Sequence, residues 1–416
     1  MSIRSVKSGI DNRKRILWSA VIGLGALVLF YFIGNIPFSI KGEKMMLKWV
    51  EFVKEDVLKV NENKYIDTLL FVNVNYDKKM CPVCKDGIPL GRLPITDRQK
   101  LLSMLQYLKQ KDDYKYILLD VRFGNDVKTE WDSALFATIE SMPRIIIPYH
   151  SDMKLADEQL KEKAGLADYY ESFWVYGFTK YPYYKKNEKT LPVKMYEDVT
   201  GRSLKKWGPF YLDGWRLANG CEFLSLDIKA NSDFYDDRKL VWYNLGTHLL
   251  NDSIPELKYK GQSSLFESPE LTKGKYIVIG SYDGDDMVST FKGRLSGAVI
   301  QYDAFCSLKK GRHKVSFGFS LFWFILFFFL SFKILNEENK QKKMDRLIGE
   351  KRLVWRIALF LLLPLITYNL ILQFCCIVIY LVFDKVFEVL LISTIFYYFS
   401  LIVKLKNQIQ TWQKKK

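Results

Sequence analysis

The chain has 416 residues, of which 49% are hydrophobic, and a formal net charge of +16. Its mean hydropathy of −0.06 averages very apolar runs with a polar middle and therefore assigns no class by itself. Much of the positive charge flanks the apolar runs, where basic residues mark the cytoplasmic side of membrane helices. The polar middle contains no basic stripe interleaved with aromatic residues, so we do not expect nucleic-acid binding.

The first apolar run, 16–36, follows a short basic tail, 1–15. A cleaved signal peptide is one interpretation of this arrangement. However, the run is longer than the apolar core of about 7–15 residues in signal peptides, and Pro37 and Phe38 stand where small cleavage-site residues are needed. We therefore predict an uncleaved transmembrane helix with a cytoplasmic N-terminus.

Residues 37–313 hold no apolar run long enough to cross a membrane, and strand patterns alternate there with helical ones. Helices are expected at 97–109, where Thr96 and Gln99 have capping-box spacing, and at 130–142. Buried strands are expected at 67–75, 116–121, 144–148 and 276–280. This alternation predicts an α/β domain with a mostly parallel sheet and flanking helices.

The stretch 151–268 is less regular and rich in turn signals. Residues 221–228 alternate like a strand with one solvated face, and residues 242–250 are expected to form a helix. We predict that this stretch forms an irregular lobe inserted into the α/β domain.

A second apolar run, 315–335, is long enough to cross a bilayer. A charged loop, 336–352, follows, and then a third apolar stretch, 353–403, whose length suits a helical hairpin with its turn within 370–388. This pattern predicts four transmembrane helices. Both termini, the charged loop and the basic tail 404–416 would then be cytoplasmic, and the α/β domain would be extracytoplasmic.

Acidic residues follow the predicted strands. Asp77 and Asp120 come directly after two of them, and Asp286 lies in the loop after the last one. Ligands of open α/β sheets bind at the carboxyl ends of the strands, where the loops converge. The three carboxylates are therefore expected to line one crevice for a polar or cationic ligand. The alternative is that each one caps a helix or a turn.

The loop after the last strand carries three clustered carboxylates, those of Asp283, Asp285 and Asp286. Such a cluster could hold a hard divalent cation through its oxygen atoms. Asp-Gly-Asp is also ordinary turn chemistry, and the spacing does not match an EF-hand loop. The loop is thus a weaker candidate for a metal site than for a structural turn.

Cys81 and Cys84 form a CxxC motif without a second cysteine pair or paired histidines, so the sequence does not predict a zinc site. On the outer face of a membrane this spacing favours a local disulfide between Cys81 and Cys84. Cys221 and Cys306 could also pair with each other, and the sequence leaves this question open.

Several short motifs occur together in the α/β domain. They are a strand ending in an acidic residue, a Pro–Arg helix start, a strand ending in Asp-x-x-Phe, and a late strand, Gly and Asp loop leading into membrane helices. The residues concerned are Asp77, Pro94, Arg98, Asp120, Phe123, Asp132, Gly280, Asp286, Thr290 and Gly297. This set resembles the type-two CHASE domain, the extracytoplasmic sensory module of bacterial histidine kinases and adenylate cyclases. The resemblance implies that Asp77, Asp120, Asp286 and Thr290 are ligand-binding candidates.

The sequence shows no glycine-rich phosphate loop, nucleophile elbow or Ser/His/Asp constellation, so we predict neither an enzyme nor a cofactor. Proteins of the resembling family usually continue into an output domain, whereas only 404–416 follow the last apolar stretch here. The leading hypothesis is a sensor in the bacterial cytoplasmic membrane that signals through a separate partner protein. The alternative is a structural or assembly subunit of an envelope complex, with the α/β domain as its docking surface. A homo-oligomer is compatible with both hypotheses.

Overall fold

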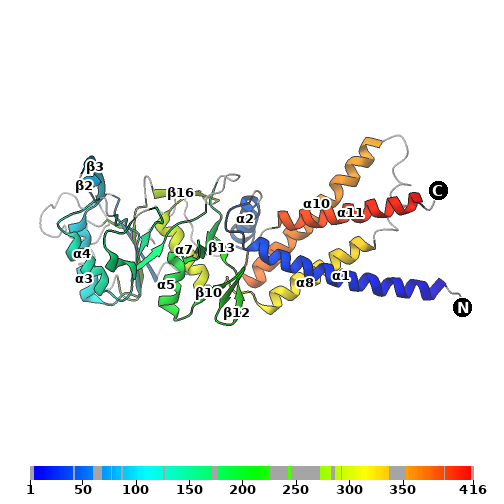
Figure 1. The fold of residues 1–416 in the computed structure, drawn as a ribbon, viewed down its shortest axis with the longest axis horizontal. Helices are drawn as coiled ribbons and strands as arrows, with labels where there is room; N and C mark the ends of the chain where they lie inside the picture. The colour runs from blue at the N-terminus through cyan, green and yellow to red at the C-terminus, as the bar shows by residue number, and fades with distance from the viewer. Residues whose placement is uncertain are drawn as a thin grey trace.

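The computed structural model of the chain is elongated, with an α/β body at one end and the long helices α1, α8, α10 and α11 at the other (Figure 1). It describes residues 4–40, 43–59, 68–75, 77–85, 88–124, 127–152, 154–170, 177–224, 242–244, 272–282, 286–291, 293–336, 353–387 and 389–413.

A parallel sheet forms the centre of the α/β body. Among the described residues its strand order is β14-β1-β15-β4-β5-β6, and every pair of neighbours is parallel. The strands are β1 (Leu69–Asn73), β4 (Tyr116–Leu119), β5 (Ile145–Tyr149), β6 (Ala164–Leu166), β14 (Trp242–Asn244) and β15 (Tyr276–Gly280). The predicted parallel sheet is thus confirmed. β15 comes last in the chain but lies in the middle of the sheet, between β1 and β4.

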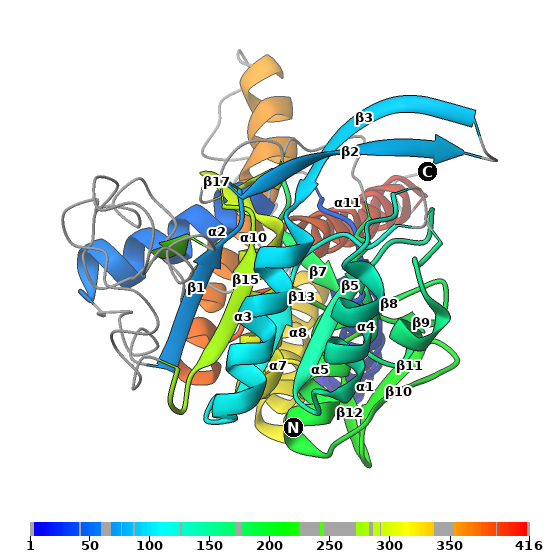
Figure 2. The same cartoon turned by 90° about the vertical axis from the view of Figure 1, so that its left-hand side faces the viewer.

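Helices cover both faces of this sheet. α3 (Arg98–Lys111) and α4 (Asp132–Ser141) lie on the face remote from the long helices, in front of the sheet in Figure 2. α5 (Leu191–Thr200) and α7 (Gly297–Lys310) lie on the opposite face, toward the long helices (Figure 1). Alternate side chains of β4 enter the two cores, Ile117 on the α3 side and Leu118 on the α7 side. Burial on both faces explains why the strands read as continuous apolar runs.

The start of α3 differs in detail from the prediction. Asp97, not Thr96, caps the helix, because Thr96 is the last residue of strand β3 (Ile88–Thr96). The Asp97 carboxylate accepts hydrogen bonds from the backbone N–H groups of Gln99, at 3.0 Å, and Lys100, at 3.3 Å. A carboxylate at this position satisfies helix N–H groups that have no partner within the helix.

The predicted disulfide is not formed in the structure, where Cys81 carries a free, buried thiol. Cys81 and Cys84 both lie on β2 (Lys78–Lys85), which pairs with β3 in an antiparallel ribbon that the sequence did not predict. Three residues along a strand separate two Cα atoms by about 10 Å. A disulfide needs about 7 Å or less, so the strand conformation works against this bridge.

The inserted lobe is more regular than predicted. It contains the strand pairs β7 (Lys180–Pro182) with β13 (Cys221–Phe223) and β8 (Tyr184–Lys185) with β9 (Glu188–Lys189). A meander of β10 (Leu204–Trp207), β11 (Phe210–Asp213) and β12 (Arg216–Ala218) lies beside the long helices (Figure 1). A short helical turn, Glu158–Lys161, and the hairpin β16 (Met287–Thr290) with β17 (Gly293–Ser296) complete the body. Cys221 and Cys306 are both free thiols.

Two predictions within the lobe need correction or lie partly outside the described residues. The helix expected at 242–250 is wrong at its start, because residues 242–244 form the edge strand β14; residues 245–250 lie outside the described residues. The strand expected at 221–228 is present as β13 over its first three residues, and residues 225–228 also lie outside the described part.

The long helices are α1 (Arg4–Gly34), α8 (Phe317–Leu335), α10 (Leu353–Phe383) and α11 (Leu390–Gln413). Among the described residues, three segments are long and apolar enough to cross a membrane: Asn12–Gly34, Phe317–Leu335 and Ile366–Phe383. They indicate a membrane protein. α1 and α8 approach closely at Gly23, where an added Cβ would lie 3.1 Å from the backbone nitrogen of Phe328.

Helix α2 (Glu43–Phe52) follows α1 after a short link and lies beside the long helices (Figure 1). One of its faces is buried, through Met46, Leu47 and Val50. The exposed side chains of Met45, Trp49 and Phe52 form an apolar stripe on another face. A helix with Trp and Phe on one side, next to a membrane span, is typical of the membrane–water interface.

We expect the apolar stripe of α2 to lie in the lipid headgroup region. An environment-sensitive fluorophore on Cys introduced by Trp49→Cys, in the full chain in lipid nanodiscs, should emit at shorter wavelength and be quenched by nitroxide-labelled lipids. The same fluorophore at the neighbouring Lys48→Cys, on the exposed polar side, should report water. Equal, water-like emission at both positions would contradict this placement.

Candidate functional site

Two of the predicted acidic residues meet at the carboxyl edge of the sheet. Asp120 directly follows β4, and Asp286 follows the loop after β15, the neighbouring strand. A Cβ added at Gly297, the first residue of α7, would lie 3.3 Å from Asp286 Oδ1 and 3.5 Å from Asp120 Oδ2. Both carboxylates therefore lie over the N-terminus of α7, in close contact with the position that a side chain at residue 297 would occupy.

Both carboxyl groups of the acidic pair, Asp120 and Asp286, lose part of their hydration at the sheet edge, where Asp120 is half-buried and Asp286 remains exposed. Burial raises the pKa of Asp120 to about 8, and the neighbouring charge of Asp286 adds to the effect. Burial also raises the pKa of Asp286 to about 6, although the nearby charges of His150 and Lys78 oppose this. Beside the pair, the buried hydroxyl of Ser296 has no hydrogen-bond partner among the described residues. The site can therefore exchange protons or a cation near neutral pH.

The other predicted ligand-binding candidates have partners elsewhere. Asp77 is buried and forms an ion pair with Lys100, with 2.7 Å between Asp77 Oδ1 and Lys100 Nζ. Thr290 ends strand β16, and its hydroxyl donates a 2.8 Å hydrogen bond to the carbonyl oxygen of Gly293 across the hairpin turn. The structure thus brings together two of the three carboxylates that were expected to share one crevice.

The predicted metal loop lies mostly outside the described residues, because 283–285, and with them Asp283 and Asp285, are not among them. Within the described part of the chain, no group of three or more His, Cys, Asp or Glu side chains could hold a metal ion. Asp286 is described, and the carboxylate that interacts with it is that of Asp120.

A basic crevice lies at the same edge of the sheet, between the end of β3, the start of α3 and the segment after β4. It has a volume of about 160 Å³. Its lining residues are Lys78, Leu93, Pro94, Ile95, Thr96, Arg98, Val121, Arg122, Gly124 and Val127. Three of them are cationic, and among the lining residues there is no carboxylate. This composition favours an anionic ligand group.

Arg98 is the most deeply buried cation of the crevice, at 5% exposure. Its Nη2 donates a 2.9 Å hydrogen bond to the carbonyl of Arg122, and its guanidinium lies over the ring of Phe123, 4.4 Å from the centroid. Asp132 is near, but its Oδ1 is 3.8 Å from Nε, too far for a hydrogen bond. Neither Nε nor Nη1 has a hydrogen-bond partner in the described part of the chain.

Burial of the Arg98 guanidinium lowers the stability of the folded protein. It lowers the pKa of the Arg98 guanidinium, and the nearby charge of Asp132 only partly offsets the effect. Buried donors without a partner cost about 1–3 kcal/mol each, more when the group is charged. A small anion with planar or tetrahedral oxygen atoms would supply the missing acceptors. The basic crevice therefore offers hydrogen-bond donors to an anionic group, and Lys78, whose charge also acts on Asp286, lies between it and the acidic pair.

The connection from α7 to α8 ties the sheet edge to the membrane helices. α7 begins at the acidic pair and ends at Lys310, and α8 begins at Phe317. In the connection, Arg312 forms a bidentate ion pair with Asp384, with Nε to Oδ2 and Nη2 to Oδ1 both at 2.8 Å. Asp384 lies in the turn between α10 and α11, so this pair joins α7 to that turn. Lys385 adds a hydrogen bond to the carbonyl of Lys314.

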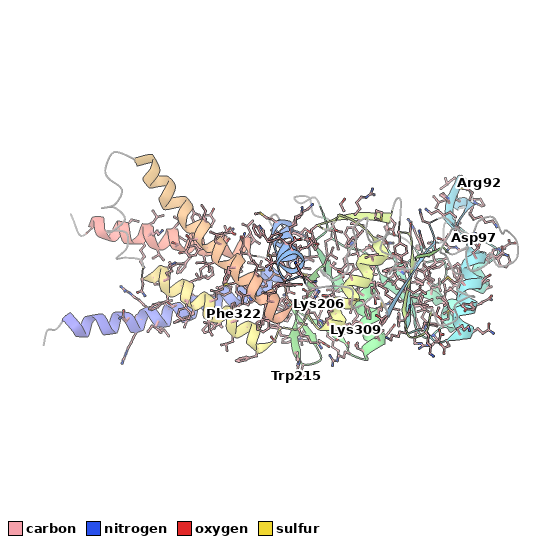
Figure 3. All side chains as sticks on the ribbon, turned by 180° about the vertical axis from the view of Figure 1, so that it is seen from behind. Arg92, Asp97, Lys206, Trp215, Lys309 and Phe322 are labelled. Carbon is pink, nitrogen blue, oxygen red and sulfur yellow. The ribbon has the colours of Figure 1, made fainter. Side chains whose placement is uncertain are left out.

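The same connection is also fastened to the lobe. The buried ring of His313 contacts Asp213 of β11 through Nε2, at 3.1 Å from Oδ2. The backbone N–H of Val315 donates a 2.8 Å hydrogen bond to Leu217 of β12. Figure 3 shows the resulting order along the molecule, with Asp97 at the far end of the body, Lys309 near its middle, and Phe322 among the long helices.

Comparisons with known proteins give no relative for this chain: no protein-family model, no curated protein and no solved structure matches it significantly.

We predict that the stability of the body depends on the protonation of the acidic pair. Because burial raises both pKa values above that of an ordinary aspartate, near 4, folding favours the protonated forms. This contribution is complete below about pH 4 and is lost as the pH rises through about 6 and 8. Asp286→Asn should therefore reduce this loss of stability by about 1 kcal/mol or less, because the Asp286 side chain is exposed and solvent screens its charge.

The measurement is the difference in unfolding free energy between the wild type and Asp286→Asn, followed from pH 5 to pH 9 by denaturant titration of the full chain in detergent. Asp152→Asn, which removes an exposed carboxylate, is the matched control. If Asp286→Asn followed the wild-type pH profile, the acidic pair would not carry the proposed electrostatic cost.

Proposed function

We propose that this protein is a membrane-anchored sensor, whose α/β body binds a small charged ligand and passes the bound state to its membrane helices. The observation that carries the proposal is the path of α7. One helix starts at the acidic pair, crosses the membrane-facing side of the sheet and ends six residues before α8. A movement of the N-terminus of α7 would therefore move the start of α8 at the membrane.

The contacts of α7 support its movement as a rigid body. Its side chains from Ala298 to Leu308 are buried. Most of the apolar ones belong to the core shared with α5 and the sheet, whereas Ile300 and Ala304 belong to the cluster that contains the long helices. Packed cores respond to local change by moving between discrete arrangements rather than by continuous deformation. Ligand binding that favours one position of α7 would therefore also favour one position of the connection 311–316 and of the turn between α10 and α11.

The ligand class follows from the two charged sites. The basic crevice offers unpartnered guanidinium donors of Arg98 to an anionic group. The acidic pair beside it accepts a proton or a cationic group. A small carboxylate or phosphate compound, with or without an amino group, fits this pair of sites, and binding rather than catalysis is the proposed activity. The resemblance to the type-two CHASE domain supports the same function.

The proposed topology has four membrane crossings, with the body outside the bacterial cytoplasm and both termini inside it. In Figure 1 the two termini lie together at the end of the molecule remote from the body. Basic residues occur at this end in both terminal segments, for example Arg13 to Arg15 and Lys404 with Lys406. Their retention on the cytoplasmic side supports the proposed orientation. The signal would then leave through a separate partner protein.

The first test uses phosphate, acetate and glycine as probe ligands, with hydrogen–deuterium exchange of the full chain in lipid nanodiscs. A probe that binds the basic crevice should slow exchange at residues 96–98 and 121–124 and should change exchange at 311–316. Arg98→Gln should abolish both effects, whereas Arg144→Gln, which removes an exposed arginine paired with Asp112, should leave them intact. An unchanged response in Arg98→Gln would contradict the assignment of the site.

The second test separates binding from transmission. Asp384→Asn removes the charge that holds Arg312 but lies far from the basic crevice. The probe should still slow exchange at 96–98, while the change at residues 389–413 should fall at least severalfold. Asp152→Asn is again the control. If no probe changed exchange at the connection, and a stable protein partner copurified on the body, the role as an assembly subunit would replace that of a sensor.

A further inference from the structure

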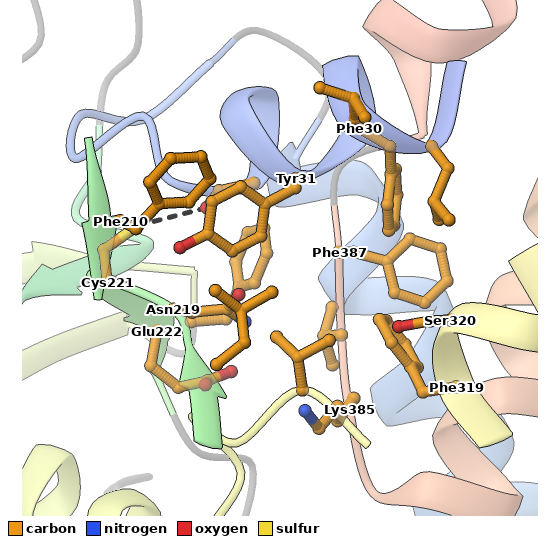
Figure 4. Close-up of a pocket in the computed structure, with 17 residues that line it drawn as sticks. Phe30, Tyr31, Phe210, Asn219, Cys221, Glu222, Phe319, Ser320, Lys385 and Phe387 are labelled. Carbon is orange, nitrogen blue, oxygen red and sulfur yellow. Dashed lines mark hydrogen bonds between the residues drawn. The ribbon is translucent and has the colours of Figure 1, made fainter. Parts of the chain in front are cut away.

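A second cavity lies at the junction between the body and the long helices, remote from the sheet edge. It has a volume of about 210 Å³ and is bounded by the end of α1, strands β12 and β13, the start of α8 and the turn between α10 and α11. An engineered cavity of about 150 Å³ already holds benzene, so this one can accept a group of similar or larger size. Figure 4 shows its lining.

One end of the junction cavity is charged. Glu222 is 7% exposed, and its Oε2 has no hydrogen-bond partner among the residues that the structure describes. Burial raises the pKa of this carboxyl group to about 7, against the opposing charges of Lys385 and Arg312. Lys385, itself 6% exposed, lines the same end (Figure 4). An unpartnered acceptor and a buried ammonium group thus face one small cavity.

The other end is apolar. The rings of Phe30, Phe319 and Phe387 line it, with centroids 5.5 Å apart for Phe30 and Phe387 and 6.2 Å apart for Phe319 and Phe387. Leu27 and Val28 of α1 continue the apolar lining, and Val28 is 51% exposed on the surface of that helix. Since α1 and α8 are candidate membrane spans, we expect this end to lie toward the hydrocarbon layer.

The charges around the cavity balance. The cationic groups near Glu222 are Lys385 and Arg312, and the second anionic group is Asp384, which pairs with Arg312. A ligand with a net charge would upset this balance in a low-dielectric site. A ligand with one positive and one negative group would instead supply a donor to Glu222 Oε2 and an anionic partner to Lys385, whose ammonium otherwise donates to the carbonyl of Lys314.

We propose that the junction cavity binds the headgroup of a zwitterionic phospholipid that carries a primary ammonium group. The ammonium donates a hydrogen bond to Glu222 Oε2, the phosphate lies toward Lys385, and the acyl chains follow the exposed faces of α1 and α8. The cavity volume suits the headgroup alone, which leaves the chains in the bilayer. This site does not depend on the proposed sensor function.

The chemistry of the cavity predicts a ranking of lipids. Phosphatidylethanolamine has N–H donors for Glu222, whereas phosphatidylcholine has the same net charge but none. Phosphatidylglycerol is anionic and has no cationic group. Loss of a hydrogen bond to a charged, buried partner costs about 1.5–3 kcal/mol, which is a ten- to hundredfold difference in affinity.

The test is titration of the delipidated full chain with these three lipids in detergent, with bound lipid counted by native mass spectrometry. One phosphatidylethanolamine should bind at least tenfold more tightly than either competitor. Glu222→Gln should remove the preference over phosphatidylcholine, because an amide oxygen attracts an ammonium less strongly. Glu140→Gln, at an exposed site on α4, should preserve it.

A second variant removes the space rather than the charge. Ser320→Phe places a ring in the cavity from α8 and should displace the bound lipid while Glu222 and Lys385 remain in place. Thermal unfolding of each variant confirms that it is folded. Equal binding of the three lipids to the wild type, or an unchanged preference in Glu222→Gln, would overturn the proposal and identify the bound molecules as nonspecific boundary lipid.

Discussion

The six-residue connection 311–316 is the constraint on which the rest of the structure depends. Six residues leave little freedom between α7 and α8, and three separate contacts fix their course: Arg312 with Asp384, His313 with Asp213, and Val315 with Leu217. The body therefore cannot turn or tilt independently of the membrane helices. A protein that needs only a membrane anchor does not require a rigid connection of this kind, because a flexible linker would also hold the body at the membrane.

Two buried sites with incomplete hydrogen bonding lie at the two ends of the body, one at the carboxyl edge of the sheet and one at the junction with the long helices. Arg98 at the sheet edge has two donors, Nε and Nη1, and Glu222 at the junction has one acceptor, Oε2, without a hydrogen-bond partner within the described residues, and both side chains are more than nine-tenths buried. Folded proteins rarely leave buried charges in this state, since each one costs stability. Ligands that complete the hydrogen bonding at both ends account for these residues without further assumptions.

Much of the sheet could be predicted from the sequence, because strands buried on both faces are continuous apolar runs. β1, β4 and β15 lie within the predicted ranges for this reason, and β5 extends one residue beyond its range, to Tyr149. The edge strand β14 was mistaken for a helix, since a short apolar run fits both periods. Asp120 and Asp286 were found because both follow strands of the same sheet. Arg98 was noted only within a motif, and its buried environment depends on β3 and the segment after β4, which local patterns do not reveal.

Glu222 shows why the junction cavity could not be predicted from the sequence. The alternation of 221–228 predicts a half-buried strand but does not identify Glu222 as a buried site residue. The surface that covers Glu222 comes instead from α1, α8 and the turn near Lys385, three segments that lie far apart in the sequence. Two sites that act on one connection must also act on each other. Suppose that the headgroup at the junction and the ligand at the sheet edge favour the same position of 311–316. The ligand then raises the affinity for the lipid, and the lipid raises the affinity for the ligand by the same factor.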